Sequence, residues 1–423
     1  MPLIRDEQSW ILLYGRRKTG KTFTVKTTRK PSLHLVVTRG GSILLSSGGS
    51  FKKTSTEDAI RKAVSMLNEG RQVFIDEFQR LPEDYWDALA LPHPSGTLIL
   101  AASSFGVIEK VYSRRSPLLG LVKPVRIPVI NASDTIASLA PRLDPVHAVQ
   151  WNVILRDPWV IPYAEDSLYH ETTIGFLVKH HRELVMTVKG LVGEVFSEEE
   201  RKLTRLYEET LKLLGAGYWS PAEIAHTLYT RGLIENPSPG TATGILGKLE
   251  AMGLVSKLKL WKTRRGRYYY KHTSPLLSIT YGLMEKYGTD ELDIPLKDEW
   301  VTDLYSRELA FTLGEVLAEH HDGIQAYTIL PHGEGDIDIV ILDKKARHPI
   351  ACYEAKTGKC KPGDKHRHRD RAANIGCPEA RTICADEDSP GTISYKTIVK
   401  HANQNIEKHI ATSNPHIKTR GKH

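Results

Sequence analysis

The sequence predicts a multidomain α/β fold in which a mostly parallel sheet comes first. The chain has 423 residues, and one hydrophobic core usually serves about 150 residues, so roughly three domains are expected. Short apolar segments alternate with helical patterns through residue 130, which is typical of parallel strands covered by helices on both faces. A glycine-containing loop directly follows the first apolar segment, at the edge where such sheets bind ligands.

The first predicted strand runs from Trp10 to Tyr14 and leads into a loop with the pattern Gly-x-x-x-x-Gly-Lys-Thr. A helix is expected from Lys21 to Lys30, and this order of strand, loop and helix is the context in which the pattern binds phosphate. Backbone N–H groups would surround the phosphates, the Lys21 ammonium would reach the β and γ oxygens, and the Thr22 hydroxyl would ligate magnesium. The residues expected to bind the nucleotide are Gly15, Arg16, Arg17, Lys18, Thr19, Gly20, Lys21 and Thr22.

Next along the chain, the pattern predicts a strand over residues 33–37, a loop or short hairpin over residues 40–49, and a helix capped by Ser55. An apolar strand then ends in two acids, Asp76 and Glu77. We expect this strand to deliver Asp76 to the magnesium and Glu77 to the attacking water, which it would polarise. The alternative is that the two carboxylates only cap the next helix.

The last strands of this domain are predicted over residues 97–102 and 125–130. Ser103 and Ser104, at the end of the first of them, would place a hydroxyl near the γ-phosphate, or would cap a loop instead. Arg114 and Arg115 would supply an arginine finger that stabilises charge on the transferred phosphoryl group, although two adjacent arginines are also common on solvated surfaces. The residues expected to act in catalysis are Glu77, Lys21, Arg114, Arg115 and Ser104.

Residues 131–200 are predicted to be partly helical and to form a lid beside the nucleotide. Three helices and a hairpin are then expected over residues 201–275, which is the element order of a winged helix-turn-helix. The hairpin turn carries cations next to aromatic residues, a combination suited to contact with DNA phosphates. The alternative is a protein-interaction module, because a fold alone does not decide function. The cations expected to contact DNA are Lys262, Arg264, Arg265 and Arg267.

The last domain is predicted over residues 301–410, after a linker at residues 276–300, and residues 411–423 are expected to form a disordered tail. One predicted strand alternates acids with isoleucines, and the next ends in Glu-x-Lys, so each strand presents polar groups on one face. An acid followed by Glu-x-Lys on a neighbouring strand is the pattern of a metal-dependent nuclease, whereas a solvated sheet face is the ordinary alternative. The candidate residues are Glu308, Asp338, Glu354 and Lys356.

The charge and the cysteine content indicate which kind of partner and which cellular compartment to expect. The formal net charge is +8 and the pI is about 9.1, which fits a polyanionic partner. No segment predicts a signal peptide or a membrane span, so a cytoplasmic protein is expected. The cysteines lack Cys-x-x-Cys spacing, so we expect reduced thiols and no zinc site. They are Cys352, Cys360, Cys377 and Cys384.

Three segments resemble the archaeal-type ATPase family, a group of P-loop ATPases related to the AAA+ and STAND classes. They are Tyr14–Thr22, Asp76–Leu81 (Asp-Glu-Phe-Gln-Arg-Leu) and Ser116–Gly120 (Ser-Pro-Leu-Leu-Gly). The resemblance covers most of the chain and implies a winged-helix module and a restriction-endonuclease-like domain after the ATPase domain. The second arginine that the family has after Pro-Leu-x-Gly is absent here, where Leu121 stands.

The four candidate residues of the last domain resemble the PD-(D/E)XK nuclease site. The resemblance implies that Asp338 and Glu354 hold magnesium and that Glu308 supports this metal or a water. It also implies that Lys356 orients the nucleophilic water or helps to deprotonate it. The proline that often precedes the first acid is missing, because Gly335 and Asp336 stand there. Binding of nucleic acid without cleavage is the alternative for this domain.

Together these features predict an ATPase that binds and hydrolyses ATP with magnesium and couples its nucleotide state to DNA. The alternative is a STAND-like signalling switch, whose winged helix and nuclease-like domain bind protein partners. A DNA-binding regulator with a decayed ATPase is least favoured, because Lys21, Thr22, Asp76 and Glu77 are all present. The sequence leaves the oligomeric state and the choice of nucleotide open.

Overall fold

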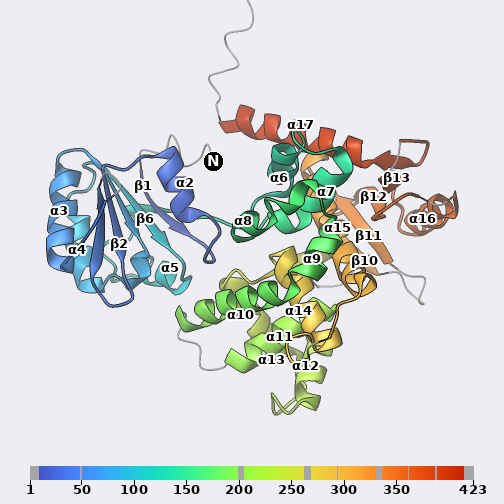
Figure 1. Cartoon of the computed structure of the whole chain (residues 1–423), viewed down its shortest axis with the longest axis horizontal. Helices are drawn as coiled ribbons and strands as arrows, with labels where there is room; N and C mark the ends of the chain where they lie inside the picture. The colour runs from blue at the N-terminus through green and yellow to red at the C-terminus, as the bar shows by residue number, and fades with distance from the viewer. Residues whose placement is uncertain are drawn as a thin grey trace, which may run out of the picture. The chain divides into compact units, whose positions relative to one another are not determined.

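The computed structural model of the chain describes residues 9–47, 50–198, 204–261, 268–292, 294–329, 336–360, 362–385 and 388–413. The chain divides into two compact units (Figure 1). The first unit consists of Met1–Pro128, Leu191–Lys202 and Ala251–Gly253, and the second consists of Val129–Gly190, Leu203–Glu250 and Leu254–His423. Within the described residues, each unit contains one seven-stranded sheet.

The sheet of the first unit has the strand order β4-β3-β2-β5-β6-β1-β7. Neighbouring strands in the series β2, β5, β6, β1 and β7 pair in parallel. At the β2 edge, β3 pairs antiparallel with β2 and forms a hairpin with β4. The predicted parallel sheet is therefore confirmed. Residues 40–49, predicted as a loop or a short hairpin, contain β3, whose hairpin partner β4 begins after this range. The strands are β1 (Trp10–Tyr14), β2 (Leu33–Val37), β3 (Ile43–Ser47), β4 (Ser50–Thr54), β5 (Gln72–Asp76), β6 (Thr97–Ala102) and β7 (Val122–Arg126).

Alternate side chains of these strands point to opposite faces of the sheet, and both faces are covered. Leu12 packs in a core that α3 and α4 share, whereas Leu13 packs in a second core with Val25 of α2. Ser55 caps α3 as predicted, because its Oγ accepts a hydrogen bond from the backbone N–H of Asp58 at 3.1 Å. The helices of this unit are α2 (Lys21–Thr28), α3 (Thr56–Asn68), α4 (Trp86–Ala90) and α5 (Gly106–Val111), with the short 3-10 helices η1 (Phe78–Arg80) and η2 (Glu83–Tyr85).

The last strand of this sheet begins earlier than the sequence predicts. The apolar pattern predicted residues 125–130, but β7 pairs with β1 from Val122, opposite Trp10, to Arg126. Each of the five residues of β1 pairs with one residue of β7, so β7 begins and ends opposite the two ends of β1. Ile130 belongs to the second unit instead, where its N–H donates to the carbonyl of Arg156 at 2.8 Å.

The second sheet joins two regions that the sequence assigned to separate domains. Its order is β14-β13-β12-β11-β10-β8-β9, and β8 pairs in parallel with β10, with Leu260 opposite Tyr327. The hairpin of the predicted winged helix therefore continues the sheet of the predicted last domain. The strands are β8 (Val255–Leu260), β9 (Tyr268–His272), β10 (Ile324–Ile329), β11 (Asp336–Leu342), β12 (Pro349–Ala355), β13 (Ala380–Cys384) and β14 (Thr392–Ser394).

Residues 276–300 are not the linker that the sequence predicted, because α14 is a buried helix. Its residues from Pro275 to Met284 are all buried, so other elements cover every side of it. A Cβ added to Gly215 of α11 would lie 2.5 Å from the backbone nitrogen of Gly282 in α14. The two helices therefore pack backbone to backbone, which only residues without a Cβ permit.

The helices predicted before the hairpin are present as α11, α12 and α13, and Ser220 caps α12. The second unit also contains the 3-10 helices η3 (Pro158–Val160) and η4 (Ser167–Tyr169). Two helices are divided between the units: the first residues of α10 and α13 belong to the second unit, and their last residues belong to the first. The α-helices are α6 (Ala132–Leu139), α7 (Pro145–Leu155), α8 (Ile161–Ala164), α9 (Thr173–Lys179), α10 (His181–Glu198), α11 (Thr204–Ala216), α12 (Pro221–Thr230), α13 (Pro239–Ala251), α14 (Pro275–Tyr287), α15 (Asp298–His320), α16 (Pro362–Asn374) and α17 (Tyr395–Ser413).

The segment predicted as a lid is helical, and most of it belongs to the second unit. Its helices α6 and α7 pack against α15 and α17. Ser133 of α6 donates to Glu319 of α15 at 2.6 Å, and Arg156 makes two contacts with Glu315 of α15, at 3.1 and 2.6 Å. Such charge-assisted contacts fix α6 and α7 on the C-terminal part of the chain. A role as a lid remains a prediction.

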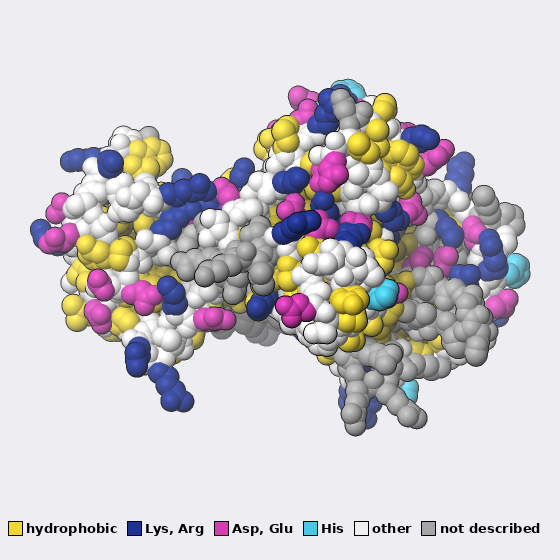
Figure 2. Space-filling view, turned by 90° about the horizontal axis from the view of Figure 1, so that it is seen from below, with side chains coloured by type: hydrophobic (Ala, Val, Ile, Leu, Met, Phe, Trp, Pro, Cys, Tyr) yellow, Lys and Arg dark blue, Asp and Glu magenta, His cyan; other side chains and the backbone are white. Residues whose placement is uncertain are grey.

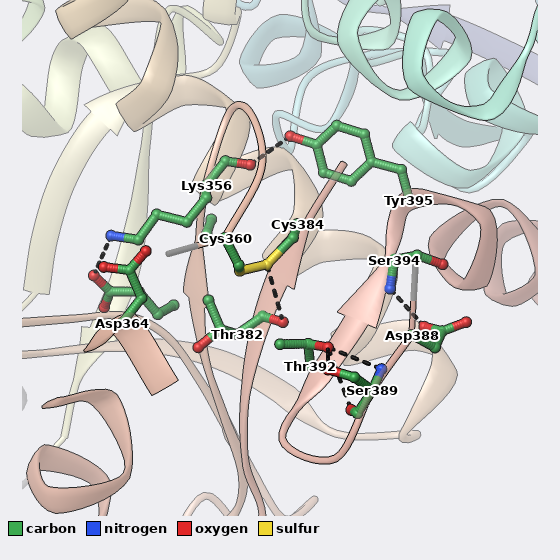
Figure 3. Close-up of a disulfide and its surroundings, with 12 residues drawn as sticks. Lys356, Cys360, Asp364, Thr382, Cys384, Asp388, Ser389, Thr392, Ser394 and Tyr395 are labelled. Carbon is green, nitrogen blue, oxygen red and sulfur yellow. Dashed lines mark hydrogen bonds and ion pairs between the residues drawn. A yellow bond between two sulfur atoms is a disulfide. The ribbon is translucent and has the colours of Figure 1, made fainter. Parts of the chain in front are cut away.

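The four cysteines form two disulfides, which contradicts the prediction of reduced thiols. Cys352 of β12 pairs with Cys377, with Cα atoms 6.3 Å apart, and Cys360 pairs with Cys384 of β13, with Cα atoms 5.5 Å apart (Figure 3). Because β12 and β13 are parallel neighbours, cysteines 24 and 25 residues apart in sequence come within bonding distance. Sequence spacing alone does not show this proximity.

The described part of the chain contains no helix that is both long enough and apolar enough to cross a membrane. In Figure 2, Lys and Arg side chains occur over much of the visible face and are interspersed with Asp and Glu side chains. On this face, the excess positive charge is therefore spread out.

The predicted tail begins inside α17, which continues to Ser413, and residues 414–423 lie outside the described residues.

Candidate nucleotide-binding site

The loop from Gly15 to Thr22 connects the carboxyl end of β1 to the first turn of α2, as predicted. Gly15 has φ of 156°, and a Cβ at this position would lie 2.2 Å from the carbonyl oxygen of Ile127. Gly20 has φ of 90° and directly precedes α2. Only glycine fits both requirements, because a side chain would clash at the first position and strain the backbone at the second. The loop therefore brings its backbone N–H groups to the start of a helix, where anions bind.

The Lys21 ammonium lies inside the curve of this loop. Its Nζ donates to the carbonyl oxygens of Gly15 at 2.8 Å and of Arg16 at 2.9 Å, and the residue is 8% exposed. Thr19 Oγ1 also donates to the Arg16 carbonyl, at 2.9 Å. The cation is thus held where phosphate oxygens would enter the loop, whereas Lys18 is exposed.

The predicted magnesium ligands lie side by side, although they are 54 residues apart in the chain. Thr22 Oγ1 donates to Asp76 Oδ2 at 2.6 Å, across the end of β6, which separates β1 from β5. Burial alone would raise the pKa of Asp76, but contacts with His34 and Thr22 outweigh it and hold this pKa below its usual value. Asp76 therefore stays ionised at neutral pH.

A hydroxyl and one carboxylate fit magnesium, which prefers oxygen ligands and takes others from phosphate and water. A closed cage of protein ligands is not required for such a site. The described residues contain no group of three or more His, Cys, Asp and Glu side chains that could hold a metal. Thr22 and Asp76 are therefore the protein groups that would hold the ion.

His34 is a neighbour of this site that sequence reasoning missed. It lies on β2 and is 6% exposed, and its ring stacks on Phe74 with centroids 4.7 Å apart. Its Nε2 lies 3.9 Å from Asp76 Oδ2, which is longer than a hydrogen bond but close enough for an electrostatic contact. No sequence motif signals this contact, because it depends on the parallel pairing of β2 with β5.

Glu77 directly follows β5 and has φ of 57°, a left-handed conformation that costs a residue with a Cβ on the order of 1–2 kcal/mol. Four donors converge on its Oε2 atom, within 3.3 Å at most. They are Gln79 Nε2 at 2.8 Å, Arg17 Nη2 at 3.1 Å, Ser103 Oγ at 3.3 Å and Arg80 Nη2 at 3.3 Å. Strained backbone at such a convergence of polar groups is typical of functional sites.

Of the two serines predicted to place a hydroxyl here, Ser103 contacts Glu77, whereas Ser104, which was expected to act in catalysis, is buried one position further along the chain. Ser103 also accepts from Gln79 Nε2 at 2.7 Å, and its backbone N–H donates to Gln79 Oε1 at 3.2 Å. Gln79 lies in the Asp-Glu-Phe-Gln-Arg-Leu segment, so that motif carried a signal that the sequence analysis left unused.

The predicted arginine-finger candidates differ from the arginines at Glu77. Arg114 and Arg115 are exposed residues that follow α5, whereas Arg17 and Arg80 lie against the Glu77 carboxylate. Arg17 makes a second ion pair, with Glu194 of α10, at 2.8 Å. Sequence reasoning missed Glu194 because it lies 177 residues further along the chain.

A second candidate site lies within the second unit, where a pocket of about 350 Å³ brings together three of the four predicted nuclease residues. Asp338 of β11 and Glu354 of β12 line it with Lys356, which follows β12. Lys356 Nζ donates to Glu354 Oε1 at 3.0 Å, and the Ala355 N–H donates to Asp338 Oδ2 at 2.9 Å. Tyr395 of α17 anchors this strand end by donating to the Lys356 carbonyl at 2.6 Å (Figure 3).

Glu308 does not line this pocket, and its role at a metal site stays a prediction. It is 1% exposed, and its Oε1 accepts a hydrogen bond from Ser278 Oγ of α14 at 2.7 Å. Arg307, one position earlier on α15, lines the pocket instead. Arg307 also reaches Glu308 Oε1 at 3.4 Å and Ser278 Oγ at 3.2 Å, so it connects the buried Glu308 to a residue that lines the pocket. The predicted DNA contacts Lys262, Arg264, Arg265 and Arg267 lie outside the described residues, between β8 and β9.

Comparison with known proteins gives structural matches of low sequence identity. No protein-family model matches the chain, and no curated protein matches its sequence. Aeropyrum pernix ORC2, solved with ADPNP and ADP, matches with a TM-score of 0.35 and 12% identity, over 72% of this chain and 89% of that chain. A. pernix ORC1 in complex with DNA matches with a TM-score of 0.24 and 16% identity, over 69% and 91%. Cdc6p from Pyrobaculum aerophilum matches with a TM-score of 0.27 and 13% identity, over 73% and 91%.

Proposed function

We propose that the first unit binds ATP together with magnesium and hydrolyses it. The observation that carries this proposal is the 2.6 Å contact between Thr22 Oγ1 and Asp76 Oδ2, next to a loop that encloses the Lys21 ammonium. A hydroxyl, a carboxylate and a cation meet there at the carboxyl end of a parallel sheet, where nucleotides bind. Each group has the chemistry that a magnesium-bound triphosphate requires.

Each residue has a defined task in this proposal. Backbone N–H groups of the Gly15–Thr22 loop bind the phosphates, and Lys21 exchanges its carbonyl contacts for the β and γ oxygens. Thr22 and Asp76 would hold magnesium, which would neutralise charge on the phosphate oxygens. Glu77 orients the attacking water, and Gln79 and Ser103 fix the direction of its carboxylate.

We further propose that the second unit binds DNA. The support is the order of α11, α12 and α13 followed by the β8–β9 hairpin, with the cations of residues 262–267 between its strands. Phosphate contacts need such cations but no particular base sequence. The same element order also occurs in protein-interaction modules, so the effect of DNA must be measured directly.

A second candidate function is metal-dependent cleavage of nucleic acid in the second unit. The pocket that joins Asp338, Glu354 and Lys356 favours it, because two carboxylates and a lysine can hold a metal ion and orient a water. Burial of Glu308 leaves two acids as the carboxylate ligands of this site. The Lys356 ion pair with Glu354 places the cation beside them.

The proposed function is tested by ATP turnover of the purified chain, measured with magnesium or with a chelator, and with or without duplex DNA. We expect turnover to require magnesium and to rise when DNA is added. No turnover under any of these conditions would contradict the ATPase assignment. Magnesium-dependent turnover that DNA does not change would instead favour a signalling switch that acts on protein partners.

A further inference from the structure

Arg17 lies in the nucleotide-binding loop itself, and its guanidinium joins two carboxylates. Nη2 lies 3.1 Å from Glu77 Oε2, and Nη1 lies 2.8 Å from Glu194 Oε2. The Arg17 side chain is 17% exposed, Glu77 is 23% exposed and Glu194 is 34% exposed, so the contact with Glu77 is the more shielded of the two. Ion pairs are stronger where water is excluded. The adjacent Lys18 is exposed, so the loop does not draw every cation inward.

Phosphate binding by backbone N–H groups does not require an arginine at this position, so its placement needs another explanation. We propose that Arg17 stabilises the charge that develops on the γ-phosphoryl group, and that Glu77 and Glu194 hold it ready before ATP binds. The inference rests on the proposed ATP hydrolysis and adds a catalytic residue to it. In this role, an arginine of the same chain would take the place of an arginine finger supplied by a partner protein.

The position of Arg17 and the charge of its possible partners support a role in catalysis. Glu77 is the carboxylate that would orient the attacking water, so a guanidinium 3.1 Å from it lies beside the reaction centre. Before ATP binds, the single charge of Arg17 is shared by two carboxylates. The γ-phosphoryl oxygens carry more charge, and they match the planar fork of a guanidinium, which makes them the stronger partner.

The reaction step follows from this exchange of partners. Arg17 turns from Glu77 to the phosphoryl oxygens, which removes one of the four donors at Glu77 Oε2, while Gln79, Ser103 and Arg80 keep the carboxylate in place. The water donates a hydrogen bond to this carboxylate. The water oxygen forms a bond to the γ-phosphorus as the bond from phosphorus to the β–γ bridging oxygen breaks, and ADP keeps that electron pair. The water proton passes to Glu77 and from there to the phosphate product.

The other arginines fit this role less well. Arg80 also contacts Glu77 Oε2, at 3.3 Å, but its Nη1 lies 3.5 Å from the Val37 carbonyl, which ties it to the end of β2. Arg80 therefore holds Glu77 in place. Arg39 pairs with Glu194 at 2.7 Å, but its side chain is 68% exposed, which makes it a matched control.

The test compares Arg17→Ala, Arg17→Lys and the control Arg39→Ala in the full chain, with ATP binding and single-turnover hydrolysis measured separately. For Arg17→Ala we expect ATP affinity within about tenfold of wild type and hydrolysis slower by about 10³-fold or more. Arg17→Lys should recover little, because an ammonium lacks the planar fork. Added guanidinium chloride should restore part of the rate of Arg17→Ala and leave Arg39→Ala unchanged.

Three results would overturn the inference. Hydrolysis by Arg17→Ala within tenfold of wild type would remove Arg17 from the reaction. A loss of ATP affinity as large as the loss of rate would show that Arg17 only binds the ground state. No hydrolysis by the wild-type chain would overturn the proposed function itself, which separates that failure from the first two.

Discussion

A Glu77→Gln variant is expected to bind ATP as the wild type does and to hydrolyse it about 10²- to 10⁴-fold more slowly, which is the usual contribution of a general base. The amide keeps the size of the side chain and can still accept from Gln79, whose Nε2 lies 2.8 Å away. It cannot take a proton from water. Nucleotide binding and steady-state turnover, measured on the same preparation, separate these two effects.

Glu83→Gln is the matched control for this experiment. Glu83 is an exposed residue of η2, and it forms an ion pair with Lys110 at 3.0 Å on the surface. We expect this variant to retain wild-type turnover, because exposed ion pairs contribute little to stability. Wild-type turnover in Glu77→Gln would show that another group activates the water.

The second large effect is expected in the second unit, where Asp338→Asn and Lys356→Met should abolish magnesium- or manganese-dependent nicking of DNA. Asn keeps an acceptor for the Ala355 N–H, which lies 2.9 Å from Asp338 Oδ2, but it lacks the charge that a metal ion requires. Both variants should retain ATP turnover. Plasmid relaxation, with and without ATP, measures the nicking.

Asp322→Asn serves as the control, because Asp322 is 73% exposed and forms a surface ion pair with Lys344. Nicking that persists in both site variants would come from another site or from a contaminant. If the wild-type chain cleaves neither DNA nor RNA, the pocket around Lys356 is a binding site and not a nuclease site.

Local sequence patterns were sufficient to predict the parts of the site that follow one another closely in the chain. The order of strand, loop and helix around Lys21 places its cation, and an apolar strand ending in Asp76 places a carboxylate at the same edge of the sheet. The period of two along β11 and β12 likewise brought Asp338 and Glu354 to one pocket. In each case the secondary structure itself determines the direction of the side chain.

Contacts between distant segments could not be predicted in this way. Glu194 meets Arg17 across 177 residues, and β8 joins β10 although the sequence assigned the two strands to separate domains. The contact of buried Glu308 with Ser278 could not be predicted either, because a helix position does not show which neighbour its side chain faces. The two disulfides depend on the parallel pairing of β12 with β13, which cysteine spacing does not encode.

The most direct test of the central claim is the affinity of Lys21→Ala for magnesium-ATP, compared with that of the wild type and of Lys26→Ala. Lys26 is an exposed lysine on the same helix, so its loss should leave ATP binding unchanged. We expect Lys21→Ala to bind roughly 10- to 100-fold more weakly, because a hydrogen bond to a charged group contributes about 1.5–3 kcal/mol. Wild-type affinity and wild-type turnover in Lys21→Ala would show that the Gly15–Thr22 loop does not bind the nucleotide.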